Sequence, residues 1–215
     1  MDQMKDYLIK FYNSKNQSEY VNKYINILQD DDIQKIFLIH TNSSDKTVKT
    51  DKTENDEVNY TEYLAIPNIF YILAIFYYTK ENYELATKYY LLAIDKGNVD
   101  AMYNLALYYD DIEKNYELVK KYYLMAIDKG YVDAMNNLAF YYKDIEKNYE
   151  LAKKYYLMAI DKGHVNAMNN LAFYYYEIEK NYELAKKYYL IAIDKGHIDA
   201  MNNLAFYYKD IEKNY

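Results

Sequence analysis

The sequence contains no cysteine and no arginine, and it uses very few glycines, prolines and histidines. Without cysteine the chain can form no disulfide framework, no thiolate metal site and no cysteine nucleophile, which fits a reducing compartment. All of its basic residues are lysines, and the formal net charge is −7. Nucleic-acid binding usually requires a basic surface, and base recognition favours the arginine fork, so we expect no nucleic acid as the main partner.

Long apolar runs are also missing. The longest, "LAIPNIFYILAIFYY" at Leu64–Tyr78, is short for a membrane-spanning helix and contains Pro67 and Asn68. The N-terminal "MDQMKDYLIKF" carries charge where a signal peptide needs an apolar segment. We therefore expect a soluble cytoplasmic protein with no transmembrane segment and no membrane partner.

The residues that usually carry catalysis form no motif. His164 and His197 occupy one position of a repeat that has Asn98 and Tyr131 in other copies, which indicates a surface turn, and His40 has no evident partner. No phosphate loop, dinucleotide fingerprint, zinc-ligand spacing or nucleophile elbow is present. We predict no catalytic residue, no metal and no cofactor.

What the sequence does contain is repetition. "NYELAKKYYLMAIDKGH" at Asn148–His164 returns at Asn181–His197 with one change, and looser copies precede it. All of the glycines recur at intervals of 33 residues: Gly97, Gly130, Gly163 and Gly196. Such a period is the signature of a solenoid, in which each unit covers the apolar face of its neighbour.

Each unit has the apolar spacing of two helices, as at Val99–Ile112 and Tyr116–Lys129. The expected N-caps of the first helices are Asp100, Asp133, Asn166 and Asp199, and those of the second helices are Asn115, Asn148 and Asn181. Each glycine then follows a second helix, at the position that tolerates a left-handed conformation.

The rest of the chain does not repeat. Residues 1–40 have helix-like apolar spacing and are expected to form a short N-terminal helical segment, whereas the polar residues 41–58 are typical of a flexible linker. Residues 59–215 hold about four repeats and a partial last one. Because "KDIEKNY" stops where a second helix would begin, the last helix is either a lone cap or part of a longer array.

The motifs "AMNNLAFYY" and "LAKKYYLMAIDKGH" resemble the Sel-one-like repeat, a relative of the tetratricopeptide repeat. The matching residues in one copy are Ala134, Leu138, Tyr142, Ala152, Tyr155, Tyr156, Ala159 and Gly163. Two departures are the Leu-Ala that replaces the Leu-Gly of the family and the "KDIEKN" that replaces its glycine-rich loop. The resemblance implies an all-α, right-handed α-solenoid of helix-turn-helix repeats that acts as a non-catalytic scaffold and binds a protein or extended peptide in its concave groove.

A ladder of asparagines marks the expected groove. In tetratricopeptide-like arrays the first helices line the concave face, so the resemblance implies that these amides bond a peptide backbone, with phenylalanines giving apolar contact and lysines attracting acidic side chains. The predicted binding residues are Asn104, Asn137, Asn170, Asn203, Phe140, Phe173, Phe206, Lys143 and Lys209. The alternative interpretation is a polar helix face enriched in asparagine by codon usage and recent duplication.

Other functions stay open at this point. Residues 1–40 could be the effector, with the repeats only positioning or oligomerising it. The carboxylates of Asp144 and Asp210 could serve a small hydrolase or transferase, although the lysines around them favour a solvated face. An apolar face left uncovered at the last repeat would favour self-association.

Overall fold

The computed structural model describes residues 67–211. The predictions for residues 1–40 and 41–58, and the start of the repeat region at 59–66, lie outside the described residues. The chain divides into two compact units, Met1–Asn98 and Val99–Tyr215, and each is described by itself. Helix is the only regular structure in the described part, and none of its helices is both long and apolar enough to cross a bilayer.

The first unit contains one described helical hairpin, formed by α5 (Pro67–Thr79) and α6 (Tyr83–Asp95). Asn82 caps α6 by accepting a hydrogen bond from the backbone N–H of Leu85 at 3.2 Å. The two helices pack through aromatic rings, since the Tyr77 and Tyr89 rings stack with centroids 5.4 Å apart. Aromatic packing of this kind lets a two-helix unit bury a large apolar area.

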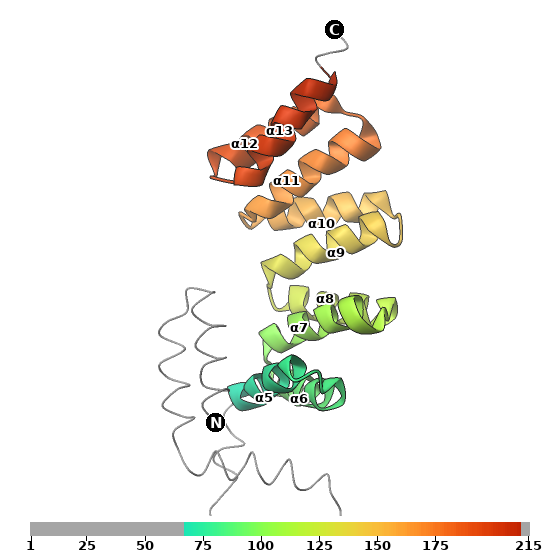
Figure 1. Cartoon of the computed structure of the whole chain (residues 1–215), viewed down its shortest axis with the longest axis vertical. Coiled ribbons are helices and arrows are strands. Elements are labelled where there is room, and N and C mark those ends of the chain that lie inside the picture. Colours follow the sequence, from blue (N-terminus) through green and yellow to red (C-terminus); the bar gives the residue numbers. More distant parts are fainter. Residues whose placement is uncertain (1–66, 212–215) are drawn as a thin grey trace, which may run out of the picture. The chain divides into compact units, whose positions relative to one another are not determined.

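The second unit is a run of hairpins stacked in chain order (Figure 1). Its elements are α7 (Val99–Tyr108), η1 (Tyr109–Glu113), α8 (Tyr116–Asp128), α9 (Val132–Asp144), α10 (Tyr149–Asp161), α11 (Val165–Tyr174), η2 (Tyr175–Glu179), α12 (Tyr182–Asp194) and α13 (Ile198–Ile211). We call α7, α9, α11 and α13, with the π-helical turns η1 and η2 that extend α7 and α11, the first helices. We call α8, α10 and α12 the second helices. The predicted helix-turn-helix repeat is confirmed.

The second helices begin and end as the sequence predicts. The side chain of Asn148 accepts a hydrogen bond from the Leu151 N–H at 3.1 Å, and Asn115 and Asn181 cap α8 and α12 in the same way. After α10, Gly163 has φ +84°, a conformation that glycine adopts without a steric penalty.

The caps of the first helices differ from the prediction. The helices α9 and α11 begin at Val132 and Val165, so Asp133 lies in the first turn, where its charge favours the helix dipole, and does not cap the helix. The cap of α11 is His164, whose Nδ1 accepts a hydrogen bond from the Ala167 N–H at 3.0 Å. His164 lies in the turn between α10 and α11, as the sequence predicts, but its side chain also caps α11 and is only 13% exposed.

Lysines take the left-handed conformation in the loops within the hairpins. Lys114, Lys147 and Lys180 have φ of 54°, 54° and 51°. Because a Cβ disfavours this region, the loop that replaces the glycine-rich loop of the family keeps a small backbone strain in each repeat.

Small and aromatic residues alternate in the core. Leu138 and Ala139 on α9 are both fully buried, and so are their counterparts on α7 and α11. An alanine side chain is therefore accommodated in the core at the position where the family has glycine. Three tyrosines at one position of the second helices, Tyr123, Tyr156 and Tyr189, are also almost completely buried.

Ion pairs connect successive hairpins at the loop ends. Lys120 on α8 donates to Glu146 of the next hairpin at 2.8 Å, and the Tyr141 hydroxyl donates to the same oxygen at 2.9 Å. The hydrogen bond to Lys120 lowers the pKa of the Glu146 carboxyl, and Glu146 in turn raises the pKa of Lys120. Lys153 and Glu179 repeat the contact one unit later, at 2.9 Å. The stack is thus held by periodic polar contacts as well as by its core.

Candidate binding surface on the first helices

Three phenylalanines are exposed at the same position of successive first helices. Phe140, Phe173 and Phe206 are 52%, 41% and 61% exposed. Scattered apolar residues on a surface are ordinary, but a contiguous apolar patch marks an interaction site. Whether the first two of these rings belong to one patch therefore depends on the side chain that lies between them.

That contact is made by Lys143. Its ammonium nitrogen lies 5.0 Å from the centre of the Phe140 ring and 5.2 Å from that of Phe173, which are cation–π distances. The same nitrogen lies 3.3 Å from Oδ2 of Asp144, and Lys143 is only 8% exposed. Phe140, Lys143 and Phe173 thus form one continuous patch, which we call the Phe–Lys–Phe clamp.

The two lysines of the predicted site differ in environment. Lys143 is covered by the clamp and paired with Asp144, so little of its charge is presented to a ligand. Lys209 occupies the equivalent position on α13 and is exposed. At this position of the described repeats, only the lysine at 209 is therefore exposed and able to attract an acidic side chain.

The asparagine ladder bonds to itself across repeats. Asn170 Nδ2 donates to Asn136 Oδ1 at 2.9 Å, and Asn203 Nδ2 donates to Asn169 Oδ1 at 2.9 Å. One repeat earlier, Asn137 Nδ2 donates to the Tyr103 hydroxyl at 3.0 Å. The amides therefore link successive first helices, and their removal would change the stability of the stack.

Part of the hydrogen-bonding capacity of the ladder is unused. Asn170 and Asn203 are half-buried, and among the described residues neither Oδ1 accepts a hydrogen bond. Each amide can still accept one bond and donate one more. Asn104, on α7, is half-buried as well. Asn170 and Asn203 can therefore form further hydrogen bonds without breaking their links between repeats.

Carboxylates lie one helical turn beyond the three phenylalanines and beyond Leu107, which holds the same position on α7. They recur with the repeat period at Asp111, Asp144, Glu177 and Asp210. Asp144 pairs with Lys143, and the Tyr176 hydroxyl donates to Asp210, so the two carboxylates weighed for a hydrolase each have a separate local partner. Within residues 67–211 no cluster of histidines and carboxylates has the size of a metal site.

One carboxyl next to this row, that of Asp110, has a raised pKa. Burial of the Asp110 side chain raises its pKa, the Asp111 charge raises it further, and Lys114 opposes both. This cluster adds negative charge at the α7 end of the same surface.

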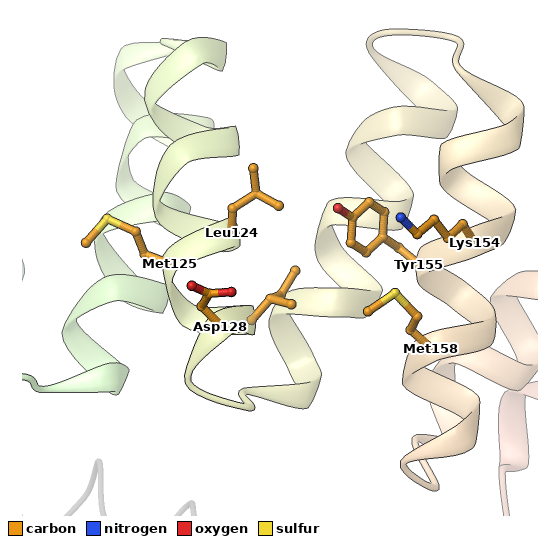
Figure 2. Close-up of a pocket in the computed structure, with 7 residues that line it drawn as sticks. Leu124, Met125, Asp128, Lys154, Tyr155 and Met158 are labelled. Atoms are coloured by element: carbon orange, nitrogen blue, oxygen red, sulfur yellow. The ribbon is translucent and has the colours of Figure 1, made fainter.

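A separate pocket lies on the second helices. It has a volume of about 380 Å³ and is lined by Leu124, Met125, Ile127 and Asp128 of α8 and by Lys154, Tyr155 and Met158 of α10. Figure 2 shows Leu124, Tyr155 and Met158 pointing into the space between the two helices. Our sequence analysis missed it, because these residues look like ordinary members of the apolar stripe of a second helix.

The comparisons with known proteins identify the repeat. The family model described as "Sel1 repeat" matches residues 75–98, 99–131, 132–164 and 165–197, more than half of the chain. The chain belongs to the Sel1 repeat family. Sel1 repeats generally act as protein-interaction scaffolds, which agrees with the resemblance noted from the sequence.

Solved structures show the same fold at low sequence identity. A Sel1 repeat protein from Oxalobacter formigenes matches with a TM-score of 0.56 and 24% identity over 69% of this chain and 64% of that one. The protective antigen c5321 of uropathogenic Escherichia coli, described as having an SLR fold, matches with a TM-score of 0.54 and 22% identity over 63% of this chain and 32% of that one. This chain therefore spans less than two thirds of either protein. A comparison with curated protein sequences finds no match.

Proposed function

We propose that the Sel1 repeats of this chain form a non-catalytic scaffold that holds a protein or an extended peptide on the exposed side of the first helices, which forms the concave groove of the array. The observation that carries the proposal is the contiguous patch of exposed phenylalanines next to asparagines with unused hydrogen-bonding capacity. An extended chain has free backbone N–H and C=O groups at regular spacing, and the repeat presents matching amides at its own regular spacing.

The test is a selection of random displayed decapeptides on the full-length protein. A variant with Phe140→Ala, Phe173→Ala and Phe206→Ala lacks the apolar rungs, and because these rings are half exposed we expect it to keep its helical circular dichroism. Peptides retained by the protein and lost by this variant would support the proposal.

The matched control is Leu124→Ala with Leu190→Ala. These leucines are 38% and 46% exposed on the second helices, so the control removes exposed apolar side chains from the other helix layer. Equal loss of peptides in the control and in the phenylalanine variant would refute the groove. Substituting the asparagines is a less direct test, because it also removes the hydrogen bonds between repeats.

A second candidate function is self-association through α13. Met201 is 50% exposed, whereas Met135 and Met168, at the same position of α9 and α11, are 4% and 3% exposed. Ile198 on the same helix is 73% exposed. A second copy that covered this face would make the sedimentation coefficient of the protein depend on concentration, and Met201→Glu would abolish the dependence. A monomer at all concentrations would rule the candidate out. The alternative that residues 1–40 are the effector stays a prediction.

A further inference from the structure

The charge of the second unit is divided between its two helix layers. The first helices of Val99–Ile211 carry ten acidic residues and two lysines, Lys143 and Lys209. The acidic residues are Asp100, Asp110, Asp111, Glu113, Asp133, Asp144, Glu177, Glu179, Asp199 and Asp210. Each second helix instead contains two lysines and two acidic residues. The first helices therefore carry an excess of acidic residues and the second helices are balanced, although Glu179 is paired with Lys153 and Glu177 lies 3.7 Å from the ammonium group of Lys180.

The acidic and apolar groups of the first helices are in register. A carboxylate follows each exposed phenylalanine by four residues, as Asp144 follows Phe140, and residues four apart lie on one side of a helix. The same pair recurs as Phe173 with Glu177, on the helix and π-turn of the next repeat. The surface thus offers an aromatic ring and then a carboxylate in three successive repeats, on α9, α11 with η2, and α13.

The chain itself shows which group fits between these elements. Lys143 places its ammonium group between the Phe140 and Phe173 rings and 3.3 Å from the Asp144 carboxylate. Two ring faces and one carboxylate are a favourable environment for a cation, and an anionic group there would meet like charge. An internal side chain therefore occupies the position that a ligand cation would take.

We infer that the partner of the first helices is a basic peptide segment, in which lysine or arginine side chains alternate with apolar ones, and that Lys143 fills one cation position until a partner side chain displaces it. This inference rests on the proposed scaffold function and specifies its ligand. Nucleic acids and anionic lipid surfaces are repelled by the same charge that attracts a basic segment.

The peptide selection described above tests the ligand class directly. Among the peptides that depend on the phenylalanines, we expect a clear excess of lysine and arginine over aspartate and glutamate. Phenylalanine-dependent peptides that are neutral or acidic would overturn the inference and leave the scaffold function standing. If no phenylalanine-dependent peptide were recovered, both would fail.

The role of Lys143 is tested by comparing Lys143→Ala with Lys209→Ala. Both variants remove one positive charge from the same repeat position, so they strengthen long-range attraction of a basic peptide equally, but only the first vacates the clamp. The affinity of a selected basic peptide, measured by fluorescence anisotropy, should rise roughly five- to tenfold more in Lys143→Ala than in Lys209→Ala, the range expected for one cation–π contact.

The two contributions also differ in their response to salt. The rise in peptide affinity that both variants share should shrink as salt concentration increases. The additional rise in affinity for Lys143→Ala should persist, because a contact inside the largely buried clamp is screened less. Equal affinities for the two variants at every salt concentration would overturn the displacement of Lys143.

Discussion

Alkaline pH should unfold the second unit through three buried tyrosines. Tyr123, Tyr156 and Tyr189 occupy one position of successive second helices and are 1%, 0% and 1% exposed. Burial raises the pKa of all three hydroxyls well above the ordinary value, and nearby carboxylates add to the effect, as Asp144 does at Tyr156. The folded state therefore holds these protons at pH values where the unfolded chain releases them.

The sign and size follow from proton linkage. A group whose folded pKa is raised contributes stability that is fully present below its unfolded pKa and is lost as pH rises toward its folded pKa. Tyrosine in an unfolded chain titrates near pH 10, so each buried hydroxyl costs about 1.4 kcal/mol per pH unit above that value. The three together lower the free energy of unfolding by about 4 kcal/mol near pH 11, a large part of the 5–15 kcal/mol of a typical domain.

The assay is an alkaline titration of the full chain, followed by far-ultraviolet circular dichroism and by tyrosinate absorbance. Helix loss and the ionisation of the buried tyrosines should coincide in one cooperative step. A variant with Tyr123→Phe, Tyr156→Phe and Tyr189→Phe should keep its helices at neutral pH and unfold at a higher pH than the parent. If all tyrosines titrated with their ordinary pKa while the helices persisted, the burial argument would be refuted.

Three further predictions concern single residues. Lys147→Gly should raise the free energy of unfolding by about 1 kcal/mol in chemical denaturation, because glycine adopts the left-handed backbone conformation without strain. Gly163→Ala should lower the free energy of unfolding by a similar amount. A lower free energy of unfolding in both variants would contradict this account. His164→Ala should cost about 1 kcal/mol of the same free energy through loss of the α11 cap, while His164→Asn should restore most of it, and equal stability of the two variants would show that the cap is unimportant. Tyr156→Phe should raise the melting temperature, because the buried hydroxyl has no hydrogen-bond partner among the described residues and its removal relieves roughly 1 kcal/mol of desolvation cost. A lower melting temperature would indicate a hydrogen-bond partner outside the described residues.

The elements that the sequence predicts well are those with a local signal. The period, the pairs of helices, the asparagine caps such as Asn148 and the glycine stops such as Gly163 all depend on a residue and its neighbours within one turn. Asparagine at a cap and glycine in a left-handed position have strong physical reasons of their own. These features could therefore be read from one copy of the repeat and extended to the others.

The elements that the sequence predicts poorly lack such a signal. Asn166 looks like the cap of α11, but the cap is His164, which acts through a ring nitrogen whose position only the backbone geometry reveals. Nothing about Lys147 marks a left-handed residue, because its conformation is imposed by the helices on either side of it. The environment of Lys143 depends on Phe173, which belongs to the next repeat and comes into contact only by stacking.

Near-identical repeats therefore give unequal surfaces. The core position held by Leu105, Leu138 and Leu171 is the same in each repeat and is fully buried each time. The position on the first helices that holds Lys143 contains aspartate, lysine, tyrosine and lysine in successive copies, at residues 110, 143, 176 and 209. These side chains have different partners, because Lys143 enters the clamp while the Tyr176 hydroxyl donates to Asp210. Since the stack tolerates this variation without loss of its core, the exposed surface can change at this position while the fold stays constant, and the binding proposed at Phe140 and Phe173 would change with it.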